Sequence, residues 1–143
     1  MAPKTDGSQA LPPGAQPRPI TPRRILVIDD EIDTARILRM LLELDGHVVA
    51  TAHDGAGALD AALRLAPEVV LLDLGMPGMD GYAIARALRG QPALARTCIV
   101  ALTGRAADAD RRRTLAAGFD HHLTKPVERR TLQEMMARLG APA

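Results

Sequence analysis

The sequence contains almost no aromatic residues. Of its 143 residues only Tyr82 and Phe119 are aromatic, and tryptophan is absent. A chain of this length can bury a substantial core as one domain. That core must therefore be built from leucine, isoleucine, valine, alanine and methionine.

Cysteine, net charge and long apolar runs are also scarce. Cys98 is the only cysteine, so no disulfide can form within the chain, and a reduced, cytoplasmic protein is expected. Because Cys98 lies in an apolar run, we expect it to be a small buried side chain. The formal net charge is +1 and the only compact basic run is Arg111 to Arg113, which argues against a nucleic-acid surface. No run approaches membrane-spanning length and no signal segment begins the chain, so membrane insertion is not expected.

The first 22 residues differ in composition from the rest. Six of the eleven prolines lie there, together with glycine, serine, glutamine and threonine. Such a composition buries too little apolar area to offset the cost of ordering. We predict a flexible tail over residues 1–22, with a docking segment as the alternative, and one folded domain over residues 23–140. No output domain is expected in what remains of the chain.

Short apolar runs and segments of helical period alternate after residue 23. The runs lie near residues 24–29, 47–51, 68–73, 97–102 and 120–123. They are continuous rather than alternating, as expected for parallel strands that helices cover on both faces. The pattern predicts a doubly wound α/β fold with five strands and five helices.

The helical segments carry recognisable faces and ends. One predicted face consists of Ile32, Ala35, Leu38 and Leu42, and another of Leu132, Met135, Met136 and Leu139. Gly46 and Gly118 are placed to end helices, Asp54 to begin one, and Pro67 to help end it.

Polar residues follow four of the apolar runs. Asp29 and Asp30 follow the first, Asp73 ends the third, Thr103 the fourth, and Lys125 follows the fifth. Ligands of open α/β sheets bind at the carboxyl ends of the strands. We therefore expect these side chains to converge on one acidic site.

The residue types at these positions favour phosphoryl chemistry. Three clustered carboxylates repel one another unless a cation is present, and Mg²⁺, with Mn²⁺ as an alternative, suits hard oxygen ligands. Asp73 could then act as a nucleophile toward phosphorus and form an acyl phosphate. Lys125 and the Thr103 hydroxyl could neutralise the phosphoryl oxygens. Lys125 is distinctive, because the chain has sixteen arginines but only two lysines.

Four motifs in order resemble the receiver domain of two-component response regulators. They are Asp29-Asp30-Glu31, Leu72 through Gly81, Ala101-Leu102-Thr103-Gly104 and Leu123-Thr124-Lys125-Pro126, and the resemblance covers about residues 23–140. It implies a flavodoxin-like (βα)5 sandwich whose parallel strands have the order 2-1-3-4-5. It also implies a phosphoacceptor that assists its own phosphorylation and dephosphorylation, rather than an enzyme.

The resemblance assigns roles to the acidic site. Asp73 would accept a phosphoryl group from a histidine kinase or a histidine phosphotransfer protein. Asp30, Asp73 and the backbone carbonyl of Gly75 would ligate Mg²⁺, with Asp29 acting through water.

Further roles follow from the same resemblance. Lys125 would contact the phosphoryl group, and Thr103 would move toward it. That movement would couple phosphorylation to the face of helix four, strand five and helix five, which would bind a downstream protein target. Pro77, Gly81 and Pro126 would support the loops, with a cis peptide bond before Pro126.

Three positions depart from the commonest receiver pattern. His122 stands where receivers usually carry an aromatic switch residue, so we hypothesise a polar, pH-sensitive switch, with simple packing of the ring as the alternative. Gly75 and Arg105 flank the path of an attacking water in this family. We expect these two to set the lifetime of the phosphorylated state.

Other functions fit these residues less well. A Mg-dependent aspartate-nucleophile phosphatase wants an acid two residues after the nucleophile, where this chain has Gly75. A flavodoxin-like cofactor module needs a loop that cradles phosphate, which Asp29, Asp30 and Glu31 would repel. The complete set of acidic, threonine and lysine positions argues against a pure binding scaffold. Within the receiver family, Met1 and the tail favour a stand-alone regulator over a receiver cut from a hybrid kinase.

Overall fold

A computed structural model describes residues 21–77, 80–104 and 111–139. The predicted tail therefore lies almost wholly outside the described residues, as does Arg105. No helix in the described part is both long enough and apolar enough to cross a membrane.

Five strands and five α-helices alternate along the described chain, as predicted. The strands are β1 (Arg24–Ile28), β2 (Val48–Ala52), β3 (Val69–Asp73), β4 (Cys98–Thr103) and β5 (His121–Thr124). The helices are α1 (Ile32–Leu44), α2 (Gly55–Leu65), α3 (Gly81–Arg89), α4 (Arg111–Ala116) and α5 (Arg129–Arg138), with a short 3-10 helix, η2, at Pro92–Leu94. Each strand boundary lies within about one residue of the predicted run.

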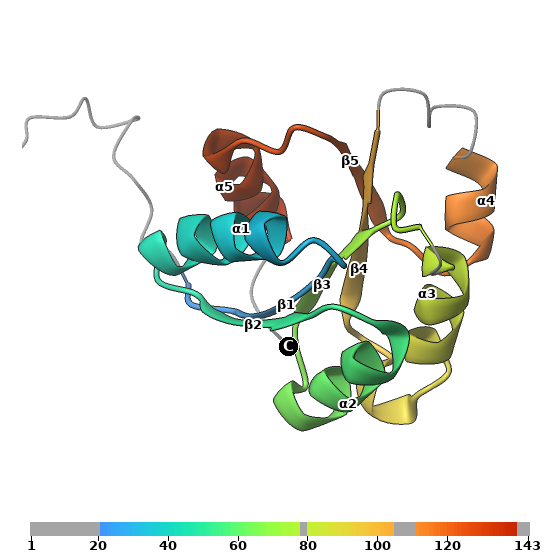
Figure 1. The fold of residues 1–143 in the computed structure, drawn as a ribbon. Coiled ribbons are helices and arrows are strands. Elements are labelled where there is room, and N and C mark those ends of the chain that lie inside the picture. The colour runs from blue at the N-terminus through green and yellow to red at the C-terminus, as the bar shows by residue number, and fades with distance from the viewer. Residues whose placement is uncertain (1–20, 78–79, 105–110, 140–143) are drawn as a thin grey trace, which may run out of the picture.

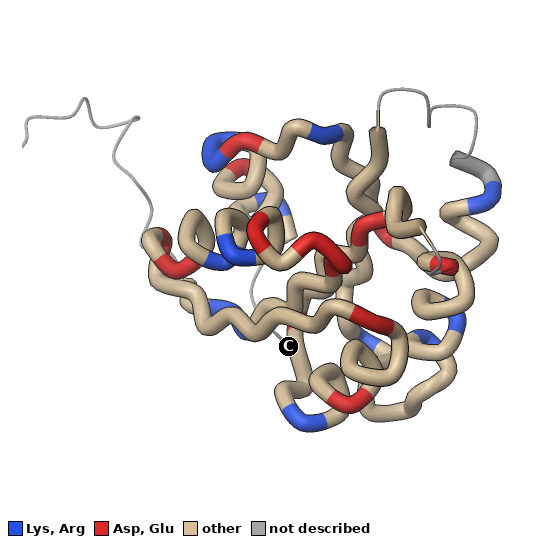
Figure 2. Tube along the Cα trace, in the orientation of Figure 1, with Lys and Arg blue, Asp and Glu red and all other residues tan. Residues whose placement is uncertain are grey.

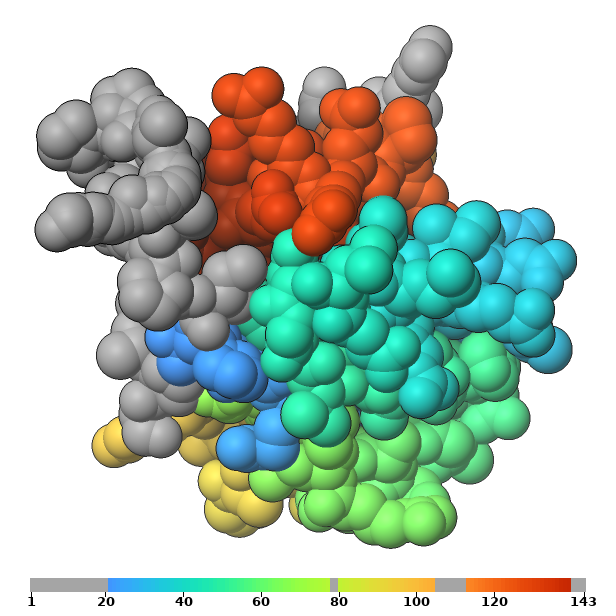
Figure 3. Space-filling model, turned by 90° about the vertical axis from the view of Figure 1, so that its left-hand side faces the viewer, coloured from blue at the N-terminus to red at the C-terminus, as the bar shows by residue number. Residues whose placement is uncertain are grey.

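The strands form one parallel sheet of order β2-β1-β3-β4-β5, which confirms the predicted fold class. Helices α1 and α5 cover one face of the sheet, and α2, α3 and α4 cover the other (Figure 1). Figure 3 shows α1 and α5 side by side on the surface of the molecule. All strand connections therefore return over the sheet, and all carboxyl ends of the strands meet at one edge.

The core consists of two apolar layers, one on each face of the sheet. All five residues of β3 are buried, which accounts for its unbroken apolar run. Leu132, Met135 and Met136 of α5 are buried against the sheet together with Ala35 and Leu38 of α1. The two aromatic rings lie on the opposite face, where Tyr82 and Phe119 meet edge to face with centroids 6.2 Å apart.

Two residues that were predicted to be buried are more exposed than expected. Ile32 is 58% exposed rather than on the buried face of α1, because it is the first residue of the helix and lies beyond the end of β1. Cys98 is only partly buried, since it is the first residue of β4.

The predicted helix ends are confirmed. Asp54 accepts a hydrogen bond from the Gly57 N–H at 2.6 Å and begins α2. Gly46 and Gly118 have φ angles of 92° and 101° after α1 and α4, a region that favours glycine. Ala66, just before Pro67, adopts a φ of 50° where α2 ends.

Candidate functional site

The acidic residues predicted to converge do so. The parallel register places Ile28 beside Leu72, so Asp29 and Asp30 follow β1 next to Asp73 at the end of β3. One carboxylate oxygen from each of these three residues lies within 4.8 Å of the others. Figure 2 shows the acidic turn after β1 beside the acidic end of β3. The cluster forms because two neighbouring strands end in carboxylates at the same edge of the sheet.

Asp73 lies at the centre of this site and is almost fully buried. Its Oδ1 accepts a hydrogen bond from the Gly75 N–H at 2.8 Å, and its Oδ2 lies 2.8 Å from Lys125 Nζ. The Asp73 side chain is 6% exposed, whereas that of Lys125 is 34% exposed. Asp73 is therefore oriented on both oxygens, and the cation beside it remains within reach of solvent.

Asp29 is the most buried carboxylate of the cluster. It is 1% exposed, and its Oδ1 accepts a hydrogen bond from the Glu31 N–H at 2.9 Å. Its Oδ2 is buried and lacks a hydrogen-bond partner among the described residues. Burial raises the pKa of Asp29, the Glu31 amide lowers it, and the charge of Asp73 raises it again.

This environment fits a divalent cation. A buried carboxylate oxygen without a donor, next to two further carboxylates, is an arrangement that a hard cation satisfies. Asp30 is exposed, so the cluster is open to solvent on one side. The donor set thus matches a Mg²⁺ that keeps several waters.

Thr103 reaches the site from β4, directly next to the end of β3. It is buried, and its hydroxyl Oγ1 lies 2.8 Å from His122 Nε2 of β5 and 3.4 Å from the Leu123 carbonyl oxygen. The Lys125 N–H donates to the Thr103 carbonyl at 2.7 Å, which holds the ends of β4 and β5 together. His122 therefore contacts Thr103 rather than only packing against the core.

The loops around the site are closely fitted. The Lys125–Pro126 peptide bond is cis, as the resemblance implies. A Cβ on Gly81 would lie 2.7 Å from Leu74 Cδ2 and 3.4 Å from the Asp73 carbonyl oxygen, so α3 begins against the turn that follows Asp73. Asp80 accepts hydrogen bonds from two N–H groups at the start of α3. Pro77 lies in this turn and is exposed.

Sequence reasoning missed two contacts at the site. His53 Nδ1 lies 2.9 Å from the Asp29 carbonyl oxygen, and the Gly75 N–H holds Asp73. His53 directly follows β2, so the rule that relevant residues follow strands would have found it. The amide contact follows from backbone geometry, which residue types do not reveal.

Comparison with known proteins identifies the family. The family model described as "Response regulator receiver domain" matches residues 25–137. The chain belongs to this family. As a receiver domain, it is a signalling module of two-component systems.

Curated relatives include regulators that are longer than this receiver. KdpE of Mycobacterium tuberculosis, a transcriptional regulatory protein, is 42% identical over 117 residues, which is 82% of this chain and 49% of the relative. The response regulator PleD of Caulobacter vibrioides is 39% identical over 105 residues, 73% of this chain and 23% of that protein. The chain thus spans about half of KdpE and less of PleD.

Solved structures share the fold. The chemotaxis response regulator CheY4 of Vibrio cholerae has a TM-score of 0.76 and 30% identity, and the match covers 84% of this chain and all of that one. The receiver domain of the sensor histidine kinase PA1611 of Pseudomonas aeruginosa has a TM-score of 0.73 and 32% identity, over 82% and 97% of the two chains. That receiver has a magnesium ion coordinated in its active-site cleft.

Proposed function

We propose that this receiver accepts a phosphoryl group on Asp73 from a phosphohistidine of a sensor histidine kinase or a histidine phosphotransfer protein. The observation that carries the proposal is that both carboxylate oxygens of Asp73 have a partner. Lys125 pairs with one oxygen, and the Gly75 N–H donates a hydrogen bond to the other. A buried carboxylate that is kept in one orientation beside a cation is prepared to attack phosphorus.

The transfer exchanges one bond to phosphorus for another. An oxygen of Asp73 forms the new O–P bond while the N–P bond of the phosphohistidine breaks, and the departing imidazole nitrogen keeps the electron pair and takes up a proton. Lys125 and Thr103 provide positive charge and a hydroxyl hydrogen to the phosphoryl oxygens. Asp29, Asp30, Asp73 and the Gly75 carbonyl would hold Mg²⁺, which neutralises charge on the phosphoryl group when bound.

Hydrolysis of external substrates is not part of the proposal. A phosphatase of this type protonates its leaving group with an acid two residues after the nucleophile. That position is Gly75, whose backbone contacts Asp73 and which has no side chain. The residues instead support a domain that takes and loses its own phosphoryl group in the cytoplasm.

The output surface is proposed to be the face of α4, β5 and α5. Thr103 contacts β5 through His122 and Leu123, so a movement of Thr103 toward Asp73 would alter β5 directly. A downstream protein would read that change, and the chain would act as a stand-alone regulator or as a phosphorelay receiver of a hybrid kinase.

The deciding experiment is phosphorylation in vitro followed by intact mass spectrometry. The protein is incubated with Mg²⁺ and acetyl phosphate, as wild type, Asp73→Asn and Asp60→Asn. Asp60 is an exposed carboxylate of α2 that pairs with Arg64 and is not a member of the acidic cluster, so it serves as the matched control.

We expect one phosphoryl adduct on the wild type and on Asp60→Asn, and none on Asp73→Asn or after Mg²⁺ is chelated. An adduct on Asp73→Asn equal to that of the wild type would overturn the assignment. So would the absence of any adduct on the folded wild type, both with acetyl phosphate and with a phosphorylated histidine phosphotransfer protein.

A further inference from the structure

His122 makes a short hydrogen bond to the threonine of the site. Its Nε2 lies 2.8 Å from Thr103 Oγ1, and the two residues come from neighbouring strands at positions two residues out of register. We propose that His122 is a positioning residue that controls the Thr103 hydroxyl through its protonation state, so that a protonated ring favours the phosphoryl-bound receiver. The inference rests on the proposed function.

The Thr103 hydroxyl has a single hydrogen to donate. Two acceptors are near it, His122 Nε2 at 2.8 Å and the Leu123 carbonyl at 3.4 Å. The first distance is that of a good hydrogen bond and the second that of a weak one. With a neutral ring whose Nε2 carries no hydrogen, the hydroxyl therefore donates to His122 and is withheld from Asp73.

Protonation of the ring reverses the direction of this bond. An imidazolium donates from both nitrogens, so Nε2 takes up one proton from solvent and donates to Thr103 Oγ1. The hydroxyl hydrogen is then left with only the weak Leu123 carbonyl. The hydroxyl hydrogen is then free to be donated to a phosphoryl oxygen on Asp73. The two residues are close enough for this because Leu102, the residue before Thr103, pairs with Asp73 in the sheet.

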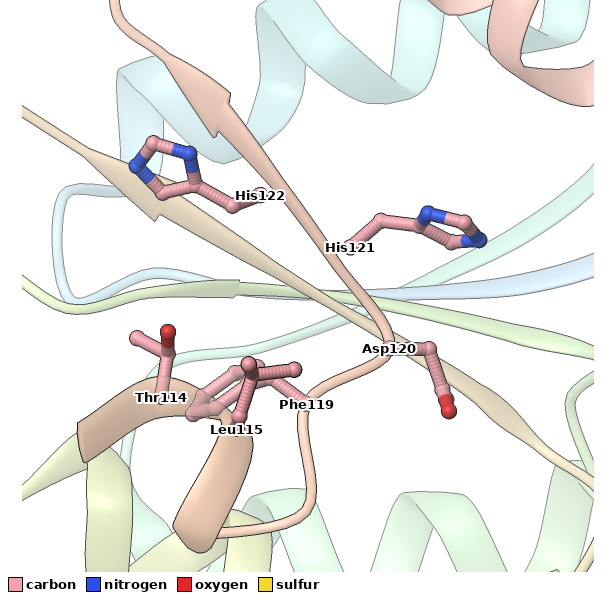
Figure 4. Close-up of a pocket in the computed structure, with 6 residues that line it drawn as sticks. All are labelled: Thr114, Leu115, Phe119, Asp120, His121 and His122. Carbon is pink, nitrogen blue, oxygen red and sulfur yellow. The ribbon is translucent and has the colours of Figure 1, made fainter. Parts of the chain in front are cut away.

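Solvent reaches the ring through a surface pocket. The pocket has a volume of about 280 Å³ and is lined by Thr114 and Leu115 of α4 and by Phe119, Asp120, His121 and His122. In Figure 4 the rings of His121 and His122 leave β5 in different directions, with α4 below them. Proton exchange at His122 therefore requires no opening of the core.

The charged neighbours of His122 are mostly engaged with other residues. Asp120 accepts hydrogen bonds from Arg89 and from the Ile99 N–H. On the site side, Lys125 pairs with Asp73. From α4, Arg113 lies over the Tyr82 ring at 4.0 Å, while the side chains of Arg111 and Arg112 are outside the described set.

His121 is the other imidazole on β5, and it is exposed. It is therefore the natural control residue.

The test measures binding of a phosphoryl analogue at equilibrium. Wild type, His122→Gln and His121→Gln are titrated with beryllium fluoride in the presence of Mg²⁺ between pH 5.5 and 8, with binding followed by NMR. The ratio of wild-type to His122→Gln affinity cancels the titration of every other group.

We expect this ratio to rise about fivefold from pH 8 to pH 5.5, the size of one modest hydrogen bond. The midpoint should coincide with the titration of the His122 ring in the same spectra, and His121→Gln should follow the wild type.

A second measurement uses the wild-type ring itself. Nitrogen-15 shifts at pH 8 should show Nε2 without a hydrogen. Because coupling is reciprocal, analogue binding at a fixed pH should increase the protonated fraction of the His122 ring in the wild type but not in Thr103→Val. This measurement stands even if His122→Gln does not fold.

The outcomes separate the inference from the function beneath it. If the analogue binds wild type but not Asp73→Asn, and the affinity ratio stays constant with pH, the role of His122 is disproved while the phosphoacceptor stands. A hydrogen on Nε2 at pH 8 would disprove it as well. If wild type and Asp73→Asn bind the analogue equally or not at all, the proposed function itself fails.

Discussion

Asp29 carries an unfavourable charge in the metal-free receiver. The pKa of Asp29 is raised chiefly by burial. The contribution of Asp29 to the free energy of unfolding is therefore fully present below its ordinary pKa of 3.8. That contribution is lost as the pH rises through the raised pKa of the folded state. At pH 7 the ionised, partly unpartnered carboxylate therefore works against folding. A bound cation would remove the penalty.

Asp29→Asn should consequently make the metal-free protein more stable. We expect the free energy of unfolding at pH 7 to rise by about 1 kcal/mol, while the stabilisation that Mg²⁺ adds to the wild type is largely lost. Urea denaturation with and without Mg²⁺ measures both effects.

Asp30→Asn is the matched comparison, because Asp30 is the exposed member of the same cluster. It should weaken the response to Mg²⁺ but change metal-free stability by less than about 0.5 kcal/mol. A destabilised Asp29→Asn protein without metal would contradict the electrostatic argument.

Residue types reveal the members of this site but not its internal bonds. Asp29, Asp73, Thr103 and Lys125 are predictable because each follows an apolar run, and parallel strands end at one edge. The unpartnered Asp29 oxygen depends on side-chain rotamers, and the His122–Thr103 bond depends on rotamers and on a diagonal contact two residues out of register between β4 and β5. No pattern along the chain encodes these.

Among the elements, α1 and α5 are joined by a polar clamp. Asp45, which caps the end of α1 and is buried, accepts hydrogen bonds from Arg129 at 2.6 Å and from Gln133 at 3.1 Å, both on α5. The Arg129 hydrogen bond is the main cause of the lowered pKa of Asp45, and burial opposes it. This contact fixes α5 beside α1 on the surface seen in Figure 3.

Asp45→Asn should loosen that clamp. We expect a loss of about 1 to 2 kcal/mol at pH 7, since Arg129 is partly exposed and solvent screens the pair. Because the pKa of Asp45 is lowered by folding, its contribution is complete above pH 3.8 and is lost as pH falls through the lowered value. The difference between wild type and variant should therefore vanish in strong acid, as thermal denaturation across pH would show.

Glu134→Gln provides the control for this clamp. Glu134 pairs with Arg130 on the exposed side of the same helix at 3.5 Å. Such a pair contributes little, so the variant should stay within about 0.5 kcal/mol of wild type at every pH. A loss as large as that of Asp45→Asn would mean that charge on α5 in general, rather than the clamp, matters.

The secondary structure follows from local sequence, but the contacts between elements do not. Apolar runs, Asp54, Gly46 and Gly118 place strands and helix ends to within about one residue. Asp45 and Arg129 are 84 residues apart, and nothing near either one indicates the other. Ile32 fails for a related reason, because helical period says nothing about where the sheet beneath a helix ends.

At the scale of the whole molecule, the sheet has one end that carries the site and an opposite end that carries the single thiol. Cys98 is the first residue of β4 and Thr103 the last, so the strand joins the two ends. Burial, followed by the charge of Asp120, raises the pKa of the Cys98 thiol to about 11. The thiol therefore contributes to the free energy of unfolding below its ordinary pKa of 9.0, and this contribution is lost as the pH rises toward about 11.

Labelling of Cys98 should therefore report whether the sheet opens as one unit. At pH 8 the native protein should react with a thiol reagent about 100-fold more slowly than the protein in urea, because only the thiolate reacts. In the native protein Mg²⁺ should leave this slow rate unchanged, since the thiol lies at the other end of the sheet. In moderate urea, where labelling requires global unfolding, Mg²⁺ should slow it by the same factor by which it stabilises the fold.

A variant with Cys98→Ala and Ala87→Cys controls for reagent chemistry, because Ala87 is exposed on α3. Its labelling should be fast in both states and insensitive to Mg²⁺. The opposite outcome is that Mg²⁺ raises the midpoint of denaturation but leaves wild-type labelling in moderate urea unchanged. In that case β4 opens at its Cys98 end while the acidic site stays folded, and the two ends of the sheet are not one cooperative unit.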